Sequence, residues 1–313
     1  MAMRSPTRCF IGLSAACVFC SVALGQSAPP SAQAAPIAAP TQTKNWTGDL
    51  DVLLKHRIIR VAVPYSKTFY YTVKGVQWGV AYEGGKAFEA FLNRKYPQTN
   101  KNLKIHVMFF VTPRDKVIQN LNDGIVDLVI AGLTVTPERQ KLVDFSDPTV
   151  TNVNEVAVTG PDGPQLSSLE DLGGKEVFVR KTSSYWEHLE ALNEHLKKEN
   201  KPVVKLTAVP EDLGDEDLLQ MVNAGLLPTT VVNDWTAKLW DKLLTRIQVH
   251  LNITVATSGS LGWAVRKDSP KFLADINEFV KKNRQGTKFG NEILANATPA
   301  RPTCSNKPYR PKA

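Results

Sequence analysis

The stretch that decides the fold of this 313-residue chain is Leu121-Asn-Asp-Gly-Ile-Val-Asp-Leu-Val-Ile-Ala-Gly-Leu-Thr-Val-Thr-Pro-Glu-Arg-Gln-Lys-Leu-Val-Asp-Phe-Ser-Asp-Pro148. The segment from Val126 to Ala131 is apolar apart from Asp127 and has the length of a buried parallel strand. Gly132, Thr134 and Thr136 come next, and Pro137 follows the last threonine directly. A hydroxyl side chain before a proline is typical of a helix start, so we expect Thr136 to cap a helix.

Arg139 falls in the first turn of that expected helix. A cation there opposes the helix dipole, which favours negative charge at that end. A ligand carboxylate would offset this cost, because a planar guanidinium can bind it through two parallel hydrogen bonds while Gly132, Thr134 and Thr136 surround it. The alternative is that Arg139 pairs with a neighbouring carboxylate such as Asp144 or Glu138.

The motif Asp-Leu-Val-Ile-Ala-Gly-x-Thr-x-Thr-Pro-Glu-Arg, followed by Val-Asp-Phe-Ser-Asp-Pro, resembles the signature of the family-3 bacterial extracellular solute-binding proteins. These are the polar amino-acid binders of ABC importers. The resemblance implies an α/β fold, the two-lobed type-II periplasmic binding protein. Each lobe would be a mostly parallel sheet flanked by helices, and two strands would form the hinge.

Strands and helices alternate along the chain, which by itself predicts parallel strands with crossover helices. We expect strands at residues 58–63, 104–110, 126–131, 156–158, 176–180, 205–210, 229–233 and 261–266. We expect helices at 50–54, 80–96, 113–122, from 137 onward, and at 166–172, 183–200, 215–226, 235–244 and 270–284. With the resemblance, this predicts one lobe from residues 45–157 plus 260–294 and a second lobe from residues 158–259.

The N-terminus predicts export to the periplasm. Residues 1–25 read as a signal peptide, with Arg4 and Arg8 before an apolar stretch too short to span a bilayer. A lipid anchor on Cys17 is the disfavoured alternative. Cleavage after Gly25 would leave Cys304 as the only cysteine, so no internal disulfide is expected. Residues 26–44 are rich in alanine and proline, which predicts a disordered linker.

The net charge of +8 is concentrated at the two ends of the chain. The first 25 residues carry +2 and the residues from Lys281 onward carry +7, which leaves −1 for residues 26–280. A nucleic-acid-binding face is therefore not expected. Residues 295–313 predict a basic, disordered tail.

The second lobe offers its own helix start at Ser183 and Ser184, whose hydroxyl and backbone N–H groups could bind an anion or simply cap the helix. The family has a glycine where this chain has Thr182. By resemblance, Asp234 stands where the family has an aspartate that binds a ligand α-amino group, although an acid there can also cap the next helix. The resemblance thus implies that Arg139 and Asp234 bind the two charges of a zwitterion.

Aromatic residues follow the first strand and could contact the ligand side chain or only pack. We include Tyr65 and Tyr71 as ligand-binding candidates. No metal-ligand constellation, phosphate loop or nucleophile motif is evident, so no metal, cofactor or catalytic residue is predicted.

Several further motifs resemble the binding half of the membrane-bound lytic murein transglycosylases F, including Leu219-Gln-Met-Val-Asn-Ala-Gly225 and Leu261-Gly-Trp-Ala-Val-Arg266. Those enzymes carry a lysozyme-like domain with a catalytic Glu-Ser pair. This chain has no Glu-Ser dipeptide, and 23 residues follow Gly290, too few for such a domain. The hypothesis is a non-enzymatic, monomeric receptor for an amino acid or short peptide that serves an ABC permease. The alternative is a peptidoglycan (muropeptide) sensing module.

Overall fold

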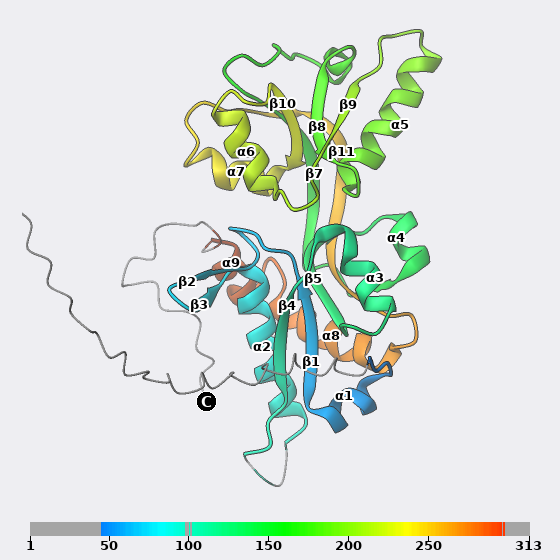
Figure 1. Cartoon of the computed structure of the whole chain (residues 1–313), viewed down its shortest axis with the longest axis vertical. Coiled ribbons are helices and arrows are strands. Elements are labelled where there is room, and N and C mark those ends of the chain that lie inside the picture. Colours follow the sequence, from blue (N-terminus) through cyan, green and yellow to red (C-terminus); the bar gives the residue numbers. More distant parts are fainter. Residues whose placement is uncertain (1–44, 98–99, 101, 296, 298–313) are drawn as a thin grey trace, which may run out of the picture. The chain divides into compact units, whose positions relative to one another are not determined.

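The computed structural model of the chain describes residues 45–97, 100, 102–295 and 297 (Figure 1). The expected signal peptide and linker lie outside the described residues, and so does nearly all of the expected basic tail. All described residues belong to one compact unit that begins at Lys44. None of their helices is long and apolar enough to cross a membrane.

The chain up to Phe145 builds the first group of elements. These are α1 (Leu50–His56), β1 (Ile58–Val63), β2 (Tyr71–Val73), β3 (Val76–Trp78), α2 (Val80–Lys95), β4 (His106–Val111), the 3-10 helix η1 (Arg114–Lys116), α3 (Val117–Asn122), β5 (Leu128–Thr134), α4 (Pro137–Leu142) and β6 (Asp144–Phe145). Strands β4, β1 and β5 lie side by side in parallel.

The rest of the chain builds a second group and then returns to the first. Its elements are β7 (Val150–Thr159), η2 (Leu169–Leu172), β8 (Glu176–Arg180), α5 (Ser184–Lys198), β9 (Lys205–Val209), α6 (Asp215–Asn223), β10 (Thr229–Asn233), α7 (Asp234–Asp241), β11 (Gln248–Val265), α8 (Pro270–Asn283) and α9 (Lys288–Ala295). Strands β10, β8 and β9 are also parallel. We call the elements around β1, β4 and β5 lobe 1 and those around β8, β9 and β10 lobe 2.

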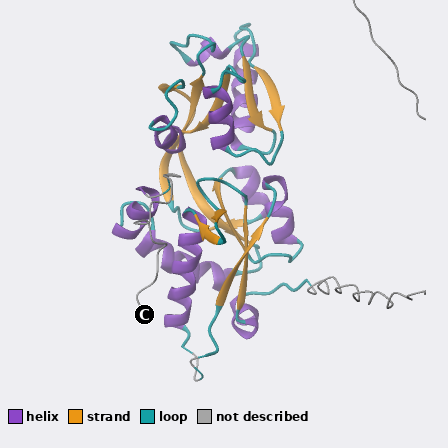
Figure 2. Cartoon of the chain, turned by 60° about the vertical axis from the view of Figure 1, so that its left-hand side comes forward, coloured by secondary structure: helices purple, strands orange, loops and turns teal. Residues whose placement is uncertain are grey.

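Two long antiparallel strands, β7 and β11, connect the lobes (Figure 2). The strand order is β4-β1-β5-β11-β7-β10-β8-β9, so both strands lie between the two parallel groups. The prediction that the last strand begins at Leu261 was wrong, since β11 begins at Gln248. Its residues from Leu251 to Ser260 are mostly exposed or half-buried and therefore lack the apolar run of a core strand. The two-strand connection of the expected fold is thus present.

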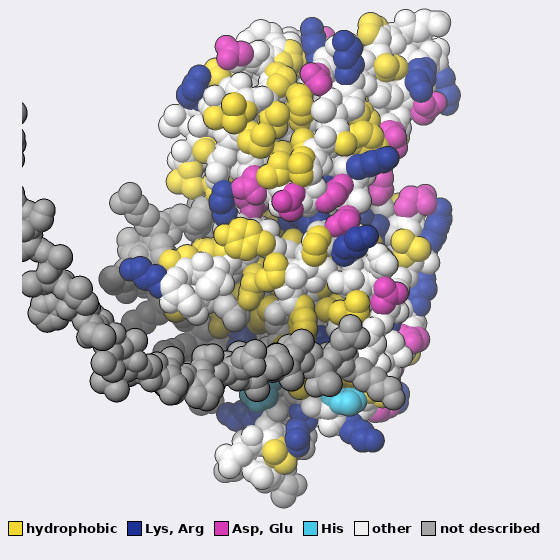
Figure 3. All heavy atoms as spheres, in the orientation of Figure 1, with side chains coloured by type: hydrophobic (Ala, Val, Ile, Leu, Met, Phe, Trp, Pro, Cys, Tyr) yellow, Lys and Arg dark blue, Asp and Glu magenta, His cyan; other side chains and the backbone are white. Residues whose placement is uncertain are grey.

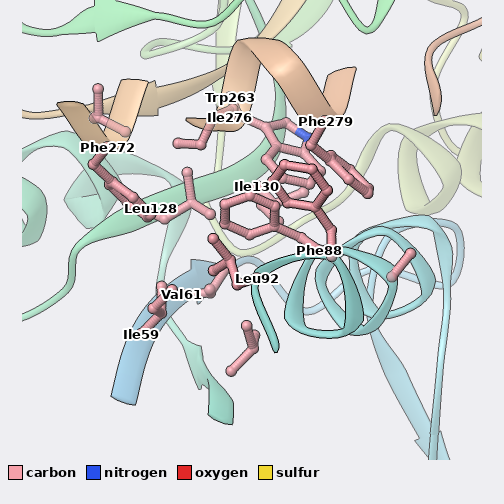
Figure 4. Packing of buried hydrophobic residues seen from close by; sticks show 14 of the residues in the cluster. Ile59, Val61, Phe88, Leu92, Leu128, Ile130, Trp263, Phe272, Ile276 and Phe279 are labelled. Carbon is pink, nitrogen blue, oxygen red and sulfur yellow. The ribbon is translucent and has the colours of Figure 1, made fainter. Parts of the chain in front are cut away.

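Lobe 1 is held together by an aromatic core that joins α2 to β11 and α8 (Figure 4). The ring of Phe88 on α2 lies 5.7 Å from Trp263 on β11 and 5.3 Å from Phe279 on α8, measured between centroids. Such pairs contribute about 0.5–1.5 kcal/mol each beyond their burial. Helix α8 therefore packs into the core of lobe 1.

Candidate functional site

A cavity of about 110 Å³ lies at the carboxyl ends of strands from both lobes. Gly132 and Thr134 belong to β5 in lobe 1, whereas Arg180 and Asn233 are the last residues of β8 and β10 in lobe 2. Open α/β sheets place ligands at this edge. The cavity is therefore the candidate binding site.

Arg139 reaches this cavity from α4. Thr136 accepts a hydrogen bond from the backbone N–H of Arg139 and Pro137 follows it, so the predicted helix cap is confirmed. The guanidinium is buried and donates to the carbonyl of Thr134 at 2.8 Å and to that of Thr182, in lobe 2, at 2.9 Å. Burial lowers its pKa.

The alternative pairing of Arg139 is not found. Glu138 pairs with Lys141 at 2.6 Å, and Asp144 pairs with Lys267 at 3.5 Å. Among the described residues Arg139 forms no ion pair with a carboxylate. A buried cation that has only neutral partners is costly, because its lost hydration is not offset by an opposite charge. An anionic ligand at the guanidinium would offset it.

Lobe 2 contributes the start of α5. Ser183 caps this helix by accepting from the backbone N–H of Trp186 at 3.3 Å. Ser184 donates to Glu155 on β7 at 2.6 Å, and its hydroxyl lies 3.1 Å from that of Thr134. The structure therefore brings Gly132, Thr134, Arg139, Ser183 and Ser184 to one cavity.

Four other predicted residues do not line this cavity. Thr136 acts as the cap of α4, Tyr65 is 58 % exposed, and Tyr71 pairs with Trp78 in the hairpin of β2 and β3. Asp234 begins α7 but accepts from the backbone N–H of Asn154 at 3.2 Å and from Lys238 at 2.7 Å. It lines a separate hollow beside β7.

The preceding residue, Asn233, lines the cavity instead of Asp234. Successive side chains point to opposite faces at the end of a strand, so only one of the two can face the site. The side-chain oxygen of Asn233 is buried and has no partner among the described residues. This hydrogen-bond acceptor therefore lies at the cavity wall, at the end of β10, where Asp234 had been expected.

The lining residues that were not predicted from the sequence include Phe69, Arg114, Arg180, Tyr185, Asp215 and Asn233. Arg180 and Asn233 end parallel strands, and Arg114 follows β4 closely. Taking the last residue of every expected parallel strand as a candidate would have found Arg180 and Asn233.

Arg180 and Asp215 form a buried ion pair at 2.5 Å. Tyr185 donates to the other carboxylate oxygen at 2.7 Å and accepts from the backbone N–H of Asn233 at 3.2 Å. Burial alone would raise the pKa of the Asp215 carboxyl, but the charges of Arg180 and Arg114 bring it below its usual value. This cluster fixes the lobe 2 wall of the cavity.

Gly132 has a left-handed backbone with φ +61°, and a Cβ there would lie 2.3 Å from the ring of Phe69. Gly132→Ala is expected to lower the free energy of unfolding by about 1–3 kcal/mol, from backbone strain and displacement of the ring. Gly286→Ala is the matched control, because Gly286 has φ +90° but open space around it. Urea unfolding of both variants measures how much of the lost free energy of unfolding comes from the steric clash with Phe69. Equal losses of free energy in the two variants would contradict a clash at Gly132.

Side chains near the start of α6 link the two lobes at the rim of the cleft. Ser66 in lobe 1 donates to Glu216 at 2.6 Å, and Lys67 pairs with Asp217 at 2.7 Å. The indole N–H of Trp240 donates to Thr68 at 3.2 Å. Acidic side chains also gather in a band across the middle of the face in Figure 3. We call the pairs of Ser66 and Lys67 with α6 the rim contacts.

Glu216→Ala is expected to weaken the rim contacts, because it leaves the buried hydroxyl of Ser66 without its acceptor. A hydrogen bond to a buried charged group contributes about 1.5–3 kcal/mol, so separation of the lobes should become roughly 10- to 100-fold more frequent. Hydrogen exchange at the amides of Thr68 and Phe69, which donate to Ser66, should then accelerate. Exchange unchanged from that of the exposed control Glu194→Ala would show that Glu216 does not hold the lobes together.

The chain is similar to several known proteins. Residues 96–291 match the bacterial extracellular solute-binding proteins, family 3. The chain is 25 % identical over 241 residues to a membrane-bound lytic murein transglycosylase F of Desulfosudis oleivorans, covering 76 % of this chain and 48 % of that protein. It is 26 % identical over 194 residues to a probable histidine-binding protein of Neisseria gonorrhoeae, covering 60 % and 66 %. The chain thus spans about half the length of the transglycosylase.

Solved structures share the fold. An ancestral arginine-binding protein bound to arginine superimposes with a TM-score of 0.61 at 24 % identity, over 76 % of this chain and 97 % of that one. At this identity the likeness establishes the fold alone. Other solved structures with this fold are also amino-acid-binding proteins.

Proposed function

Because the chain belongs to the bacterial extracellular solute-binding proteins of family 3, we propose that it is a periplasmic receptor for a small amino-acid-like solute. The observation that carries the proposal is the buried guanidinium of Arg139. It lines the interlobe cavity and has only backbone carbonyls as partners, one from each lobe. A ligand carboxylate would supply the missing charge and replace these carbonyls.

The proposed mechanism is binding coupled to bending at β7 and β11. Both strands carry a residue with positive φ, Asn152 on β7 and Ser258 on β11, and their pairing shifts register repeatedly between His250 and Ser260. Bulges of this kind bend strands locally and so support a hinge here. Ligand that contacts both lobes would favour the closed arrangement.

The proposed partner is an ABC permease, to which a monomeric receptor would deliver the solute. The similarity to the probable histidine-binding protein supports this role. The second candidate is a muropeptide-sensing module. It is favoured by the match to the transglycosylase, which extends over 76 % of this chain.

A thermal-shift panel on the purified full chain tests the proposal. The panel contains the standard amino acids, short peptides and muropeptide fragments. A ligand present at about a hundred times its dissociation constant should add roughly 2.7 kcal/mol to the free energy of unfolding. Stabilisation by an amino acid supports the receptor, and stabilisation by muropeptides alone supports the sensing module. Stabilisation by none of them would contradict both.

A further inference from the structure

The cavity has more positive than negative charge on its walls. Three arginines line it, Arg114, Arg139 and Arg180, against two aspartates. Asp215 is paired with Arg180 at 2.5 Å, and Asp115 is exposed and lies 3.8 Å from Lys116. Two guanidiniums, those of Arg114 and Arg139, therefore remain without a carboxylate partner among the described residues.

The proposed function uses Arg139 but leaves Arg114 unexplained. A guanidinium has five N–H donors, and the one hydrogen bond found for Arg114 goes to the carbonyl of Ala131 at 3.0 Å. Its guanidinium lies 5.9 Å from the ring centroid of Phe69, which also lines the cavity. Burial lowers the pKa of Arg114, and the nearby charge of Arg180 lowers it further. The carboxylates of Asp215 and Glu216 raise the pKa of Arg114 in turn, but they are bonded to Arg180 and to Ser66. Neither forms an ion pair with Arg114 among the described residues.

Asn233 supplies a hydrogen-bond acceptor in the same cavity as the two unpaired guanidiniums. Its side chain is 5 % exposed, and its buried oxygen has no partner among the described residues. An oxygen in this position can accept a hydrogen bond from a ligand ammonium group. An unpaired acceptor at a cavity wall is costly unless a ligand satisfies it.

We propose that the ligand is a small acidic amino acid. This inference rests on the proposed function. The α-carboxylate would bind Arg139, the side-chain acid would bind Arg114, and the amino group would donate to Asn233. A cavity of about 110 Å³ suits a small ligand, since sites for drug-sized molecules usually measure about 300–1,000 Å³. A cationic ligand such as arginine would place like charge against Arg114, which opposes binding.

Calorimetric titration of the full chain with four amino acids tests this specificity. L-Glutamate or L-aspartate is expected to bind at least about 30-fold more tightly than L-glutamine or L-arginine, because the neutral or cationic analogue leaves Arg114 unpaired. If glutamine or arginine binds as tightly as the acids, the acidic specificity is overturned and the proposed receptor function stands. If none of the four binds, the acidic specificity is overturned, and the thermal-shift panel decides whether the receptor function fails as well.

The variant Arg114→Met tests whether Arg114 contacts the ligand or only supports the structure of the cavity. It is expected to weaken binding of the acidic ligand by at least about 30-fold while changing that of the neutral amide less than about 3-fold. Arg94→Met, on the exposed face of α2, is the matched control and should change neither affinity. Equal losses for acid and amide in Arg114→Met would overturn the assignment of Arg114 to the side-chain acid.

Discussion

Arg139→Gln is expected to weaken ligand binding by roughly 30- to 1,000-fold, the largest effect of any single change in the cavity. Removing one partner of a buried, charge-assisted hydrogen-bonded pair costs about 2–4 kcal/mol. Arg139 is 9 % exposed, and its guanidinium lies where both lobes meet the cavity. Glutamine keeps hydrogen-bonding capacity but loses the charge, so the loss reports on an anionic ligand group.

Titration calorimetry with the strongest ligand of the thermal-shift panel measures this effect. Arg94→Gln is the control, because it removes an exposed arginine on α2 without touching the cavity. The unliganded Arg139→Gln protein should unfold at the wild-type temperature or above it, since a buried, unpaired cation is lost. Binding within about threefold of wild type would mean that the ligand carboxylate lies elsewhere.

Asp127→Ala is expected to lower the free energy of unfolding by about 3–5 kcal/mol, because it leaves a buried cation unpaired. Asp127 is 1 % exposed and accepts from the backbone N–H of Arg60 and, at 2.7 Å, from its guanidinium. Arg266 lies 3.5 Å away. Trp46 covers the guanidinium of Arg60 at 3.6 Å from the ring centroid. The pair ties β1 to the start of β5.

Urea unfolding measures the loss in Asp127→Ala. The matched control is Asp51→Ala, which removes an exposed aspartate paired with Lys271 at 2.6 Å. Exposed pairs contribute about 0–1 kcal/mol, so the control should stay close to wild type. A loss below about 1 kcal/mol for Asp127→Ala would contradict the structural role of this buried pair.

The sequence predicted those helices and strands in which apolar residues recur at the regular spacing of the element. The apolar run before Gly132 lies in β5, although the strand begins at Leu128 and continues to Thr134, and Thr136 and Pro137 begin α4 as expected. The hairpin of β2 and β3 was missed because its strands have only three residues each and bury little. The polar part of β11 was missed because a strand that passes between lobes lacks a buried face there.

The site was predictable only in part, for reasons of geometry. Thr134 and Arg139 line the same cavity as the serines at the start of α5. Whether Asn233 or Asp234 faces the cavity depends on the residue at which β10 ends and α7 begins. A shift of this boundary by one residue would exchange the two side chains. The position of Arg114 beside Arg180 depends on how the two lobes meet. No local pattern in the sequence encodes that contact.

The most direct test of the account is a crystal structure of the full chain with its strongest ligand bound. We expect a ligand carboxylate at about 2.7–2.9 Å from the guanidinium of Arg139, with further contacts to the start of α5 in lobe 2. This result would confirm an interlobe receptor site. A ligand bound in the hollow beside Asp234, or on one lobe without contact to Arg139, would contradict it.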